Sequence, residues 1–289
     1  MLTKEQFHNK IAAGLRYLDG ATGSNLQKVG MPKGCCTESW VLEHPEALVH
    51  LQRQYAEAGC QILYAPTFQA QPIALERVGL AEQTEKINAQ LVALSKQAAP
   101  DCLIAGDLTT LATYTDSYDP GKFDLLVDNY RRQIRGLMDG GADLLVAETL
   151  MYPQEAEAVL TAAELEQAGA VMYSFVMTPD GALFSGAEIG PFLREMEQSG
   201  AAAVGFNCVA ADDMTPYLVG KLRRYVKGPL ICKPNAGIPV INSSGVVQYN
   251  MDIAEFIQIQ RQNLANGATL LGGCCGTTPD FMAAMIQSL

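Results

Sequence analysis

The sequence contains very little histidine. Only three of its 289 residues are histidines, His8, His44 and His50, and all of them precede residue 51. A metal site built on imidazole, or a serine or cysteine nucleophile activated by histidine, needs such residues near the reacting groups. We therefore expect no histidine-based hydrolase or nucleophile site.

Basic residues are also scarce. Lys and Arg total 20 against 31 Asp and Glu, which gives a formal net charge of −11. An acidic chain without basic clusters is a poor ligand for nucleic acid or for an anionic membrane surface. No segment approaches the roughly 20 apolar residues that span a bilayer, and the amino terminus lacks the features of a signal peptide. We expect a cytoplasmic protein with no nucleic-acid or membrane partner.

Cysteine is too infrequent for a disulfide scaffold. The chain has eight cysteines, 48% hydrophobic and 18% charged residues, and 26 glycines. This composition is that of a folded globular protein. In a reducing compartment we expect the cysteines to be free, metal-bound or catalytic, so their positions matter more than their number.

One junction recurs along the chain, in which a helix-like stretch ends at Gly and a short apolar run follows, as in YAEAG-CQILYA, LMDGG-ADLLVA and LANG-ATLLGG. Gly suits the residue after a helix, where φ is positive, and the run suits a strand buried on both faces. The pattern predicts eight strands, at 16–19, 61–66, 102–107, 143–148, 171–176, 203–207, 229–234 and 268–273.

Eight strands alternating with helices predict an α/β fold, a single-domain (β/α)8 TIM barrel over residues 1–289. A doubly wound open sheet is the alternative, but no Gly-x-Gly-x-x-Gly follows the first strand. Residues 3–6 resemble a capping box, which would begin a short helix able to close the bottom of the barrel.

Polar residues and thiols follow the predicted strands. In a barrel the carboxyl ends of the strands share one mouth, where the chemistry is done. Each residue alone could simply cap a turn or a helix, but their convergence favours a site. They are Asp19, Thr67, Asp107, Glu148, Asn207, Cys208, Asn235, Cys274 and Cys275.

The thiols give the sharpest hypothesis. Cys208 follows the sixth strand and Cys274-Cys275 follow the eighth, with glycines on both sides of the pair. Three thiolates with an open fourth position match a catalytic Zn²⁺ site. The alternative is that these cysteines are small buried hydrophobic residues. A second pair, Cys35-Cys36, lies after the first strand and competes as a ligand pair.

Zinc on three thiolates suits alkyl transfer to sulfur, because it holds a substrate thiol as the nucleophilic thiolate. An amino-acid substrate would need a carboxylate for its ammonium group, and Glu148 and Asp19 are candidates. Its carboxylate could accept backbone N–H groups from the turn at Gly20 and Ala21. Thr67 and Asn207 complete the expected substrate pocket.

The same motifs resemble a known family. LDGATGS, HPEALVHLQRQYAEAG, PTF, AET, GFNC, PNAG and GGCCGTTP span most of the chain. Together they are similar to the homocysteine-binding barrel of the homocysteine S-methyltransferase family. The resemblance implies that Cys208, Cys274 and Cys275 bind zinc, that homocysteine sulfur takes the fourth position, and that Glu148 holds the substrate ammonium. Asn235 looks like the residue that occupies the zinc when substrate is absent.

The resemblance also bears on the methyl donor. CCGTTP together with PNAG looks like the cobalamin-dependent methionine synthases, which implies a methyl-corrinoid donor, whereas small-donor users typically read CCRTTP. Gln69 follows PTF where betaine users carry tyrosine, which argues against betaine. Because the chain ends at Leu289, just after its last predicted helix, we expect methylcobalamin to be supplied in trans, on a separate corrinoid protein.

The sequence therefore predicts a zinc-dependent enzyme that methylates homocysteine to methionine. Two alternatives remain. One is a free-standing enzyme that uses S-methylmethionine or another small donor. The other is a non-catalytic zinc- or thiol-binding subunit of a larger methyltransferase assembly.

Overall fold

The computed structural model describes residues 1–178, 181–241 and 247–289. Its centre is a curled sheet of parallel strands in the order β1-β2-β3-β4-β5-β6-β9. These strands are β1 (Ile62–Tyr64), β2 (Leu103–Thr109), β3 (Leu144–Leu150), β4 (Val171–Phe175), β5 (Ala203–Ala210), β6 (Leu230–Asn235) and β9 (Leu270–Leu271).

Two residues close the sheet. Tyr17 forms a parallel bridge to Leu271 of β9, and Leu18 forms one to Ile62 of β1. The predicted (β/α)8 barrel is therefore confirmed. The strand predicted at 16–19 is reduced to these two bridging residues, and its backbone still bonds both neighbours, with the Leu18 N–H donating to the Leu271 carbonyl at 2.8 Å.

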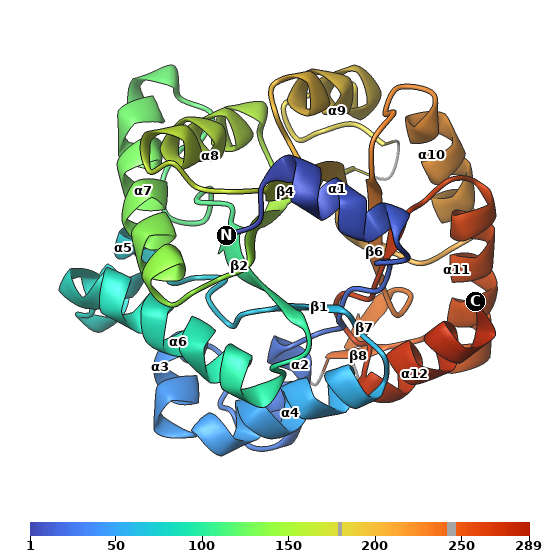
Figure 1. Cartoon of the computed structure of the whole chain (residues 1–289), viewed down its shortest axis with the longest axis horizontal. Coiled ribbons are helices and arrows are strands. Elements are labelled where there is room, and N and C mark those ends of the chain that lie inside the picture. The colour runs from blue at the N-terminus through green and yellow to red at the C-terminus, as the bar shows by residue number, and fades with distance from the viewer. Residues whose placement is uncertain (179–180, 242–246) are drawn as a thin grey trace.

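The longer helices surround the barrel (Figure 1). They are α4 (Pro45–Glu57), α6 (Thr84–Ala98), α7 (Phe123–Asp139), α8 (Pro153–Leu165), α9 (Ile189–Gln198), α10 (Met214–Arg223), α11 (Ile253–Ala265) and α12 (Pro279–Ser288). Proline stands at the first turn of α4, α8 and α12, where its missing N–H has no intrahelical acceptor to lose. The short helices α2 (Gly23–Lys28), α3 (Thr37–Glu43) and α5 (Pro72–Leu75) lie in the first two βα connections.

Helix α1 (Lys4–Ala12) covers the amino ends of the strands (Figure 1). Thr3 and Gln6 form the predicted capping box at its start. Phe7 is fully buried with the barrel-lining residues Leu18 and Ile62. The Leu2 N–H donates to the Asp143 carbonyl at 2.7 Å, just before β3. This end of the barrel is thus closed, and the opposite end is left for a site.

Alternation along each strand builds two apolar layers. Leu144 and Val146 of β3 pack inside the barrel, whereas Leu145 and Ala147 pack between the sheet and the helices. Successive side chains of a strand point to opposite faces, so the next inward position after Val146 is Glu148. The periodicity that forms the core therefore also aims this carboxylate inward.

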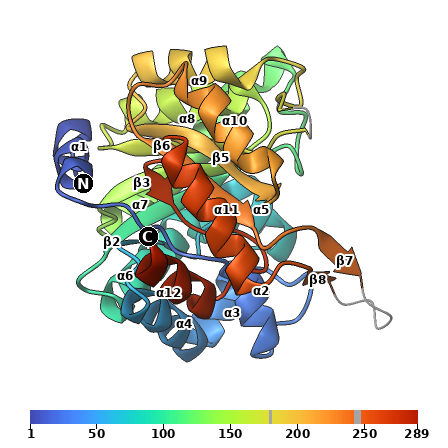
Figure 2. The ribbon, with the colours of Figure 1, turned by 90° about the vertical axis from the view of Figure 1, so that its right-hand side faces the viewer.

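An antiparallel hairpin that the sequence analysis did not predict follows β6. It pairs β7 (Pro239–Ile241) with β8 (Val247–Tyr249) and projects from the barrel beside α2 and α3 (Figure 2). Its strands are three residues long and mostly exposed, so they show no clear pattern of alternate burial.

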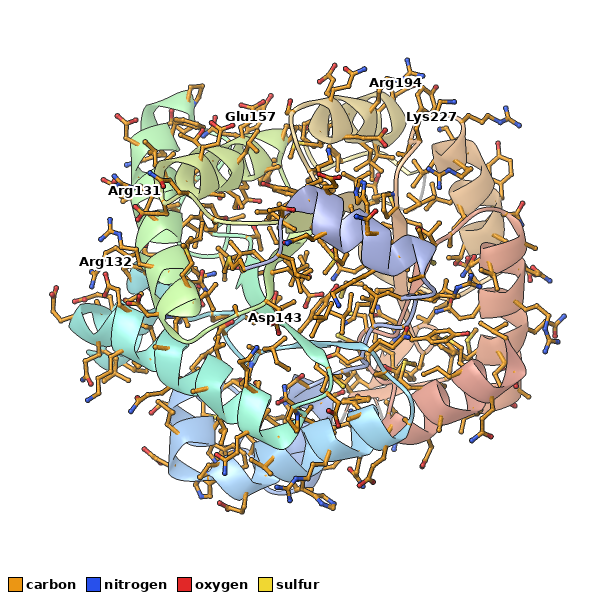
Figure 3. The ribbon with its side chains drawn as sticks, viewed as in Figure 1. Arg131, Arg132, Asp143, Glu157, Arg194 and Lys227 are labelled. Carbon is orange, nitrogen blue, oxygen red and sulfur yellow. The ribbon has the colours of Figure 1, made fainter. Side chains whose placement is uncertain are left out.

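Charged side chains lie on the outer helices. Arg131 and Arg132 extend from α7 (Figure 3), where Arg131 pairs with Glu166 at 2.7 Å and Arg132 with Glu85 at 2.8 Å. These pairs link α7 to its two neighbouring helices.

None of the helices in the described ranges is long and apolar enough to cross a membrane.

The glycine of the GFNC motif gives a test of the barrel packing. A Cβ at Gly205 would overlap the backbone of Ile231 in β6, and the backbone of a central strand cannot move aside cheaply. We expect Gly205→Ala to lower the free energy of unfolding by about 1–3 kcal/mol or more, measured by urea denaturation. Gly23→Ala is the control, because no heavy atom lies within 4 Å of its Cβ position. An equal effect of both variants would contradict this packing.

Candidate active site

A cavity of about 330 Å³ opens at the carboxyl end of the barrel. Side chains from six strand ends and from the loops after them form its wall. The residues that carry chemistry there are Glu38, Tyr64, Asp107, Glu148, Thr149, Cys208, Lys233, Cys274 and Cys275. Five of the nine strand-end residues named from the sequence line this cavity, namely Asp107, Glu148, Cys208, Cys274 and Cys275.

Three thiols gather at one side of this cavity. Cys208 lies in β5, and Cys274 and Cys275 follow β9. Their sulfur atoms all lie within 4.8 Å of one another, and the Cys208 and Cys275 sulfurs are 4.0 Å apart. Within the described ranges this is the one group of His, Cys, Asp or Glu residues that could hold a metal ion.

The geometry of these thiols fits zinc. A tetrahedral ion with Zn–S bonds of about 2.3 Å requires sulfurs about 3.8 Å apart, close to the separation observed. Asn235, on the strand between β5 and β9, is 7% exposed, and its Oδ1 has no hydrogen-bond partner in the described structure. A buried amide oxygen without a partner is costly unless something binds it. The donor set therefore suits a cation with three sulfur ligands.

The three thiols form hydrogen bonds with one another and with a tyrosine. Hydrogen bonds from Cys208 and Cys274 hold the pKa of Cys275 well below its usual value, and the bond to Cys274 is the main factor that raises the pKa of Cys208. The Tyr249 hydroxyl also hydrogen-bonds Cys275. Tyr249 lies on β8, so the hairpin supplies a site residue that sequence reasoning missed.

Two glycines allow the turn at Cys274-Cys275. Gly276 has φ of 84°, and a Cβ there would overlap the ring of Tyr249. A Cβ at Gly273 would lie 2.5 Å from the Thr277 hydroxyl. Any other residue at these two positions would displace the loop that carries both thiols.

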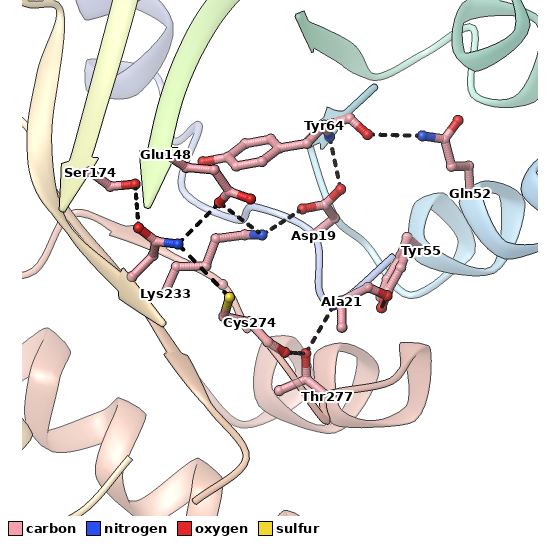
Figure 4. A network of polar contacts seen from close by, with 12 residues as sticks. Asp19, Ala21, Gln52, Tyr55, Tyr64, Glu148, Ser174, Lys233, Cys274 and Thr277 are labelled. Carbon is pink, nitrogen blue, oxygen red and sulfur yellow. Dashed lines mark hydrogen bonds and ion pairs between the residues drawn. The ribbon is translucent and has the colours of Figure 1, made fainter. Parts of the chain in front are cut away.

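Beside Cys274, a buried lysine lies among carboxyl groups (Figure 4). The Lys233 Nζ is 3.2 Å from Asp19 Oδ1 and 3.9 Å from Glu148 Oε2, and it lies 4.3 Å from the centre of the Tyr64 ring. The Lys233 side chain is 4% exposed. Sequence reasoning missed this residue, although it directly precedes the PNAG motif.

Burial and mutual repulsion control the charges here. Burial raises the pKa of Glu148 to about 8, and the Lys233 ammonium opposes that shift. Burial, and next the charge of Glu148, raise the pKa of Asp107 well above its usual value. Burial alone would lower the pKa of Lys233, but Asp19 and Glu148 outweigh it and keep this pKa well above normal. The lysine is therefore charged. A second cation near Glu148 or Asp107 would lower the pKa of that carboxyl group and favour its ionised form.

The turn after the first bridge lies next to this wall (Figure 4). The Tyr64 N–H donates to Asp19 Oδ2 at 2.8 Å, which fixes that carboxylate. The Ala21 N–H donates to the Thr277 hydroxyl at 3.2 Å, and the Tyr55 hydroxyl donates to the Ala21 carbonyl at 2.8 Å. Gly20 and Ala21 both line the cavity, as expected.

Three predicted pocket residues, Asp19, Thr67 and Asn207, lie behind the residues that line the cavity. The Thr67 hydroxyl donates to the Asp107 carbonyl at 2.9 Å and accepts the Asp107 N–H at 3.0 Å. Asn207 is fully buried, and its side-chain oxygen accepts hydrogen bonds from Thr149 of β3 and Ser174 of β4. Cys35 and Cys36 do not join the metal-type cluster; the Cys36 thiol donates to Glu38 at 3.4 Å.

Fold and site together define a (β/α)8 barrel with a trithiol cluster and an acidic pocket at its mouth. A family model described as "Homocysteine S-methyltransferase" matches residues 17–289. The chain belongs to this family, and the resemblance inferred from the motifs is confirmed.

Individual relatives agree with this assignment. The methionine synthase of Mycobacterium leprae (strain TN) is 27% identical over 288 residues, covering 91% of this chain and 23% of that protein. That of Mycobacterium tuberculosis (strain ATCC 25618 / H37Rv) is 26% identical over 90% of this chain and 23% of its own length. The chain thus spans about a quarter of these relatives.

A solved structure matches the whole fold. The metallated form of the Escherichia coli homocysteine methyltransferase MmuM superposes with a TM-score of 0.83 and 24% sequence identity, covering 98% of this chain and 100% of that one. A methyltransferase from Methanosarcina mazei gives a TM-score of 0.61 with 12% identity. These likenesses show the fold.

The buried lysine makes a test of the acidic wall possible. Removing its ammonium leaves Asp19 and Glu148 without the cation between them, so we expect Lys233→Met to lower the free energy of unfolding at pH 7 by about 3 kcal/mol. Lys96→Met is the control, because its pair with Asp143 is 40% and 26% exposed. An exposed pair contributes at most about 1 kcal/mol. Urea denaturation at matched zinc content measures both.

The same variant should change the pH dependence of stability. Glu148 holds its proton more tightly folded, with a pKa of about 8, than at its usual 4.5. Stability therefore falls as pH rises between these values. Without Lys233 this pKa rises further, and the fall should continue above pH 8. A stability curve parallel to that of the unmodified protein would contradict the assigned role of Lys233.

Proposed function

We propose that this chain transfers a methyl group to the sulfur of homocysteine, giving methionine, with Cys208, Cys274 and Cys275 holding a zinc ion. The observation that carries the proposal is the meeting of the three sulfurs within 4.8 Å at the cavity. When bound, the ion would supply Lewis acidity that keeps the substrate thiol deprotonated at neutral pH.

The amino-acid end of the substrate fits the acidic wall of the cavity. Glu148, with the pKa raised by burial to about 8, gains a counter-charge when the substrate ammonium arrives, which favours its ionised form. The substrate carboxylate would lie at the turn of Gly20 and Ala21, since both of these residues line the cavity. Lys233 and Tyr64 keep Asp19 occupied and leave Glu148 as the ammonium site.

The transfer itself is a direct displacement. The substrate sulfur forms a bond to the methyl carbon while the bond between that carbon and the donor breaks, and its electron pair stays with the donor. The residues of this chain hold the thiol and the amino-acid group in one orientation, which lowers the entropic cost of aligning the sulfur with the methyl carbon. No general base acts on the methyl group.

We propose further that the donor is a methyl-corrinoid carried by another protein. The CCGTTP and PNAG motifs support this donor. The hairpin at the mouth also exposes Val240, Ile241 and Val247, with exposed fractions of 50%, 72% and 47%. Exposed apolar groups beside a cavity suit a large partner better than a small free donor.

A donor panel separates the possibilities. The chain is incubated with homocysteine and, in separate arms, with methylcobalamin, a methylated corrinoid protein, S-methylmethionine, S-adenosylmethionine or betaine, and methionine is quantified. Methionine from the corrinoid arms supports the proposal. Turnover only with S-methylmethionine supports a free-standing enzyme. Zinc binding with no methionine in any arm supports a non-catalytic subunit.

The cysteine cluster gives a direct prediction. Cys275→Ser removes the thiolate that lies 4.0 Å from Cys208, so we expect zinc affinity to fall more than about 100-fold, beyond the 10- to 100-fold typical of outer-shell changes. The fold should persist, because the core layers lie elsewhere. Chelator competition measures affinity, with Cys102→Ser, outside the cluster, as the control. Normal zinc occupancy and turnover in Cys275→Ser would refute the assignment.

The acidic pocket gives a second prediction. Glu148→Gln keeps the shape of the side chain but removes the charge for the ammonium group, so we expect the homocysteine KM to rise about 10- to 100-fold. Zinc content should not change. Glu157→Gln, on the exposed face of α8, is the matched control. Unchanged KM in Glu148→Gln would remove this residue from the substrate pocket.

A further inference from the structure

Two site residues have an unusual backbone conformation. Thr149 and Cys208 both have φ of 58°, in the left-handed region that residues other than glycine rarely adopt. In the described ranges the one other such residue is Gln167, in the turn after α8. A β-branched residue such as Thr149 is especially disfavoured there, at a cost of about 1–3 kcal/mol. Interactions with neighbouring residues must therefore offset the conformational cost at these two positions.

Both positions interrupt regular strand pairing. The register between β3 and β4 shifts between Ala147 and Leu150, and that between β5 and β6 shifts between Asn207 and Ala210. The shifts change which side chains face the mouth. Glu148 and Thr149 are consecutive, yet both line the cavity, which a regular strand with alternating side chains does not allow.

One side chain connects the two irregular sites. Asn207 Oδ1 accepts the Thr149 N–H at 2.8 Å and the Ser174 hydroxyl at 2.9 Å. Asn207 Nδ2 donates to the Thr149 hydroxyl at 2.7 Å and lies 3.4 Å from Glu148 Oε2. Asn207 is fully buried and does not line the cavity. Its amide is therefore saturated by protein groups of β3 and β4.

The neighbours of this amide belong to both halves of the site. Cys208 follows Asn207 directly, Glu148 precedes Thr149, and the Asn207 Nδ2 is 3.9 Å from the Cys274 sulfur. The Ser174 hydroxyl, the Glu148 carboxylate and the Cys274 thiol surround one small region behind the cavity (Figure 4). The Asn207 amide thus contacts the end of β3, which carries the proposed ammonium site. Asn207 itself directly precedes Cys208, the first of the three thiols.

We propose that Asn207 is a positioning residue that couples the metal half of the site to the amino-acid half. Its amide holds Thr149 in the left-handed conformation and fixes the residue directly before Cys208, so that the Glu148 carboxylate and the Cys208 sulfur are oriented together. This role replaces the substrate contact expected from the sequence. It rests on the proposed function only for the identity of the amino-acid ligand.

The test measures two ligands that touch different residues. Asn207→Asp keeps the acceptor for Thr149 and Ser174 but replaces the donor with a carboxylate oxygen facing Glu148. We expect zinc affinity, by chelator competition on the metal-free protein, and methionine affinity of the zinc-loaded protein, by calorimetry, both to fall at least 10-fold. The melting temperature should fall as well, because the variant buries a new carboxyl group beside Glu148.

A pair of milder variants guards against misfolding of Asn207→Asp. Thr149→Val removes only the hydroxyl that accepts from Asn207, whereas Thr149→Ser keeps it. We expect Thr149→Val to weaken both zinc and methionine about 3- to 10-fold and Thr149→Ser to leave both within 2-fold. Ser174→Ala, which removes one contact of the amide, should have an effect smaller than that of Asn207→Asp.

Specific results would overturn the proposal. If Asn207→Asp and Thr149→Val bind zinc as the unmodified protein does and lose only methionine, Asn207 acts on the substrate pocket alone. If both ligands are unaffected, the amide has no positioning role. If the unmodified protein binds zinc but no methionine, the proposed function fails, and the zinc measurements alone still decide whether Asn207 positions the thiols.

Discussion

The site depends on the closure of a parallel barrel. Because the strands are parallel, their carboxyl ends all reach one rim, and because Tyr17 and Leu18 join β9 to β1, the first and last strands become neighbours. The Gly273 N–H then bonds the Asp19 carbonyl at 3.0 Å, which seats the thiol loop beside the acidic wall. Without this closure, Asp19 and the loop after β9 would lie at opposite edges of an open sheet. The thiols of that loop would then lie far from Asp19.

Charge is the second constraint on the rim. Three buried carboxylates, Asp19, Asp107 and Glu148, face one buried ammonium, that of Lys233. Burying an ion costs several kcal/mol unless a partner compensates it. Burial therefore raises the pKa values of Asp107 and Glu148, and a ligand that brings an ammonium group would favour the ionised form of the carboxyl group that it meets. The thiol cluster has the same need, since three thiolates side by side require a cation. Both halves of the site thus favour cationic groups for the same electrostatic reason.

The sequence predicted the barrel and its thiols because both follow from local signals. Glycine after each helix and apolar runs of four to six residues locate the strands, and any polar residue just after a strand must lie at the rim. The sequence did not predict the role of Lys233, because the identity of a lysine in a strand does not indicate whether its ammonium group points into the barrel. Tyr249 was missed because its hairpin has exposed strands of three residues. Thr67 and Asn207 were placed at the right end of the barrel, but which polar atom meets which partner is decided by packing between strands.

The irregular backbone is confined to the rim for an energetic reason. Below the rim, the inner layer around Phe7 and Leu144 and the outer layer against the helices require regular alternation, since a slip of one residue would turn every apolar side chain to the wrong layer. At the rim the strands end, so a register shift displaces only the last few residues. The hydrogen bonds of Asn207 contribute roughly 1 kcal/mol each, a sum comparable with the cost of two left-handed residues. The chain can therefore orient Glu148 and Cys208 against backbone preference only where the core no longer dictates the register.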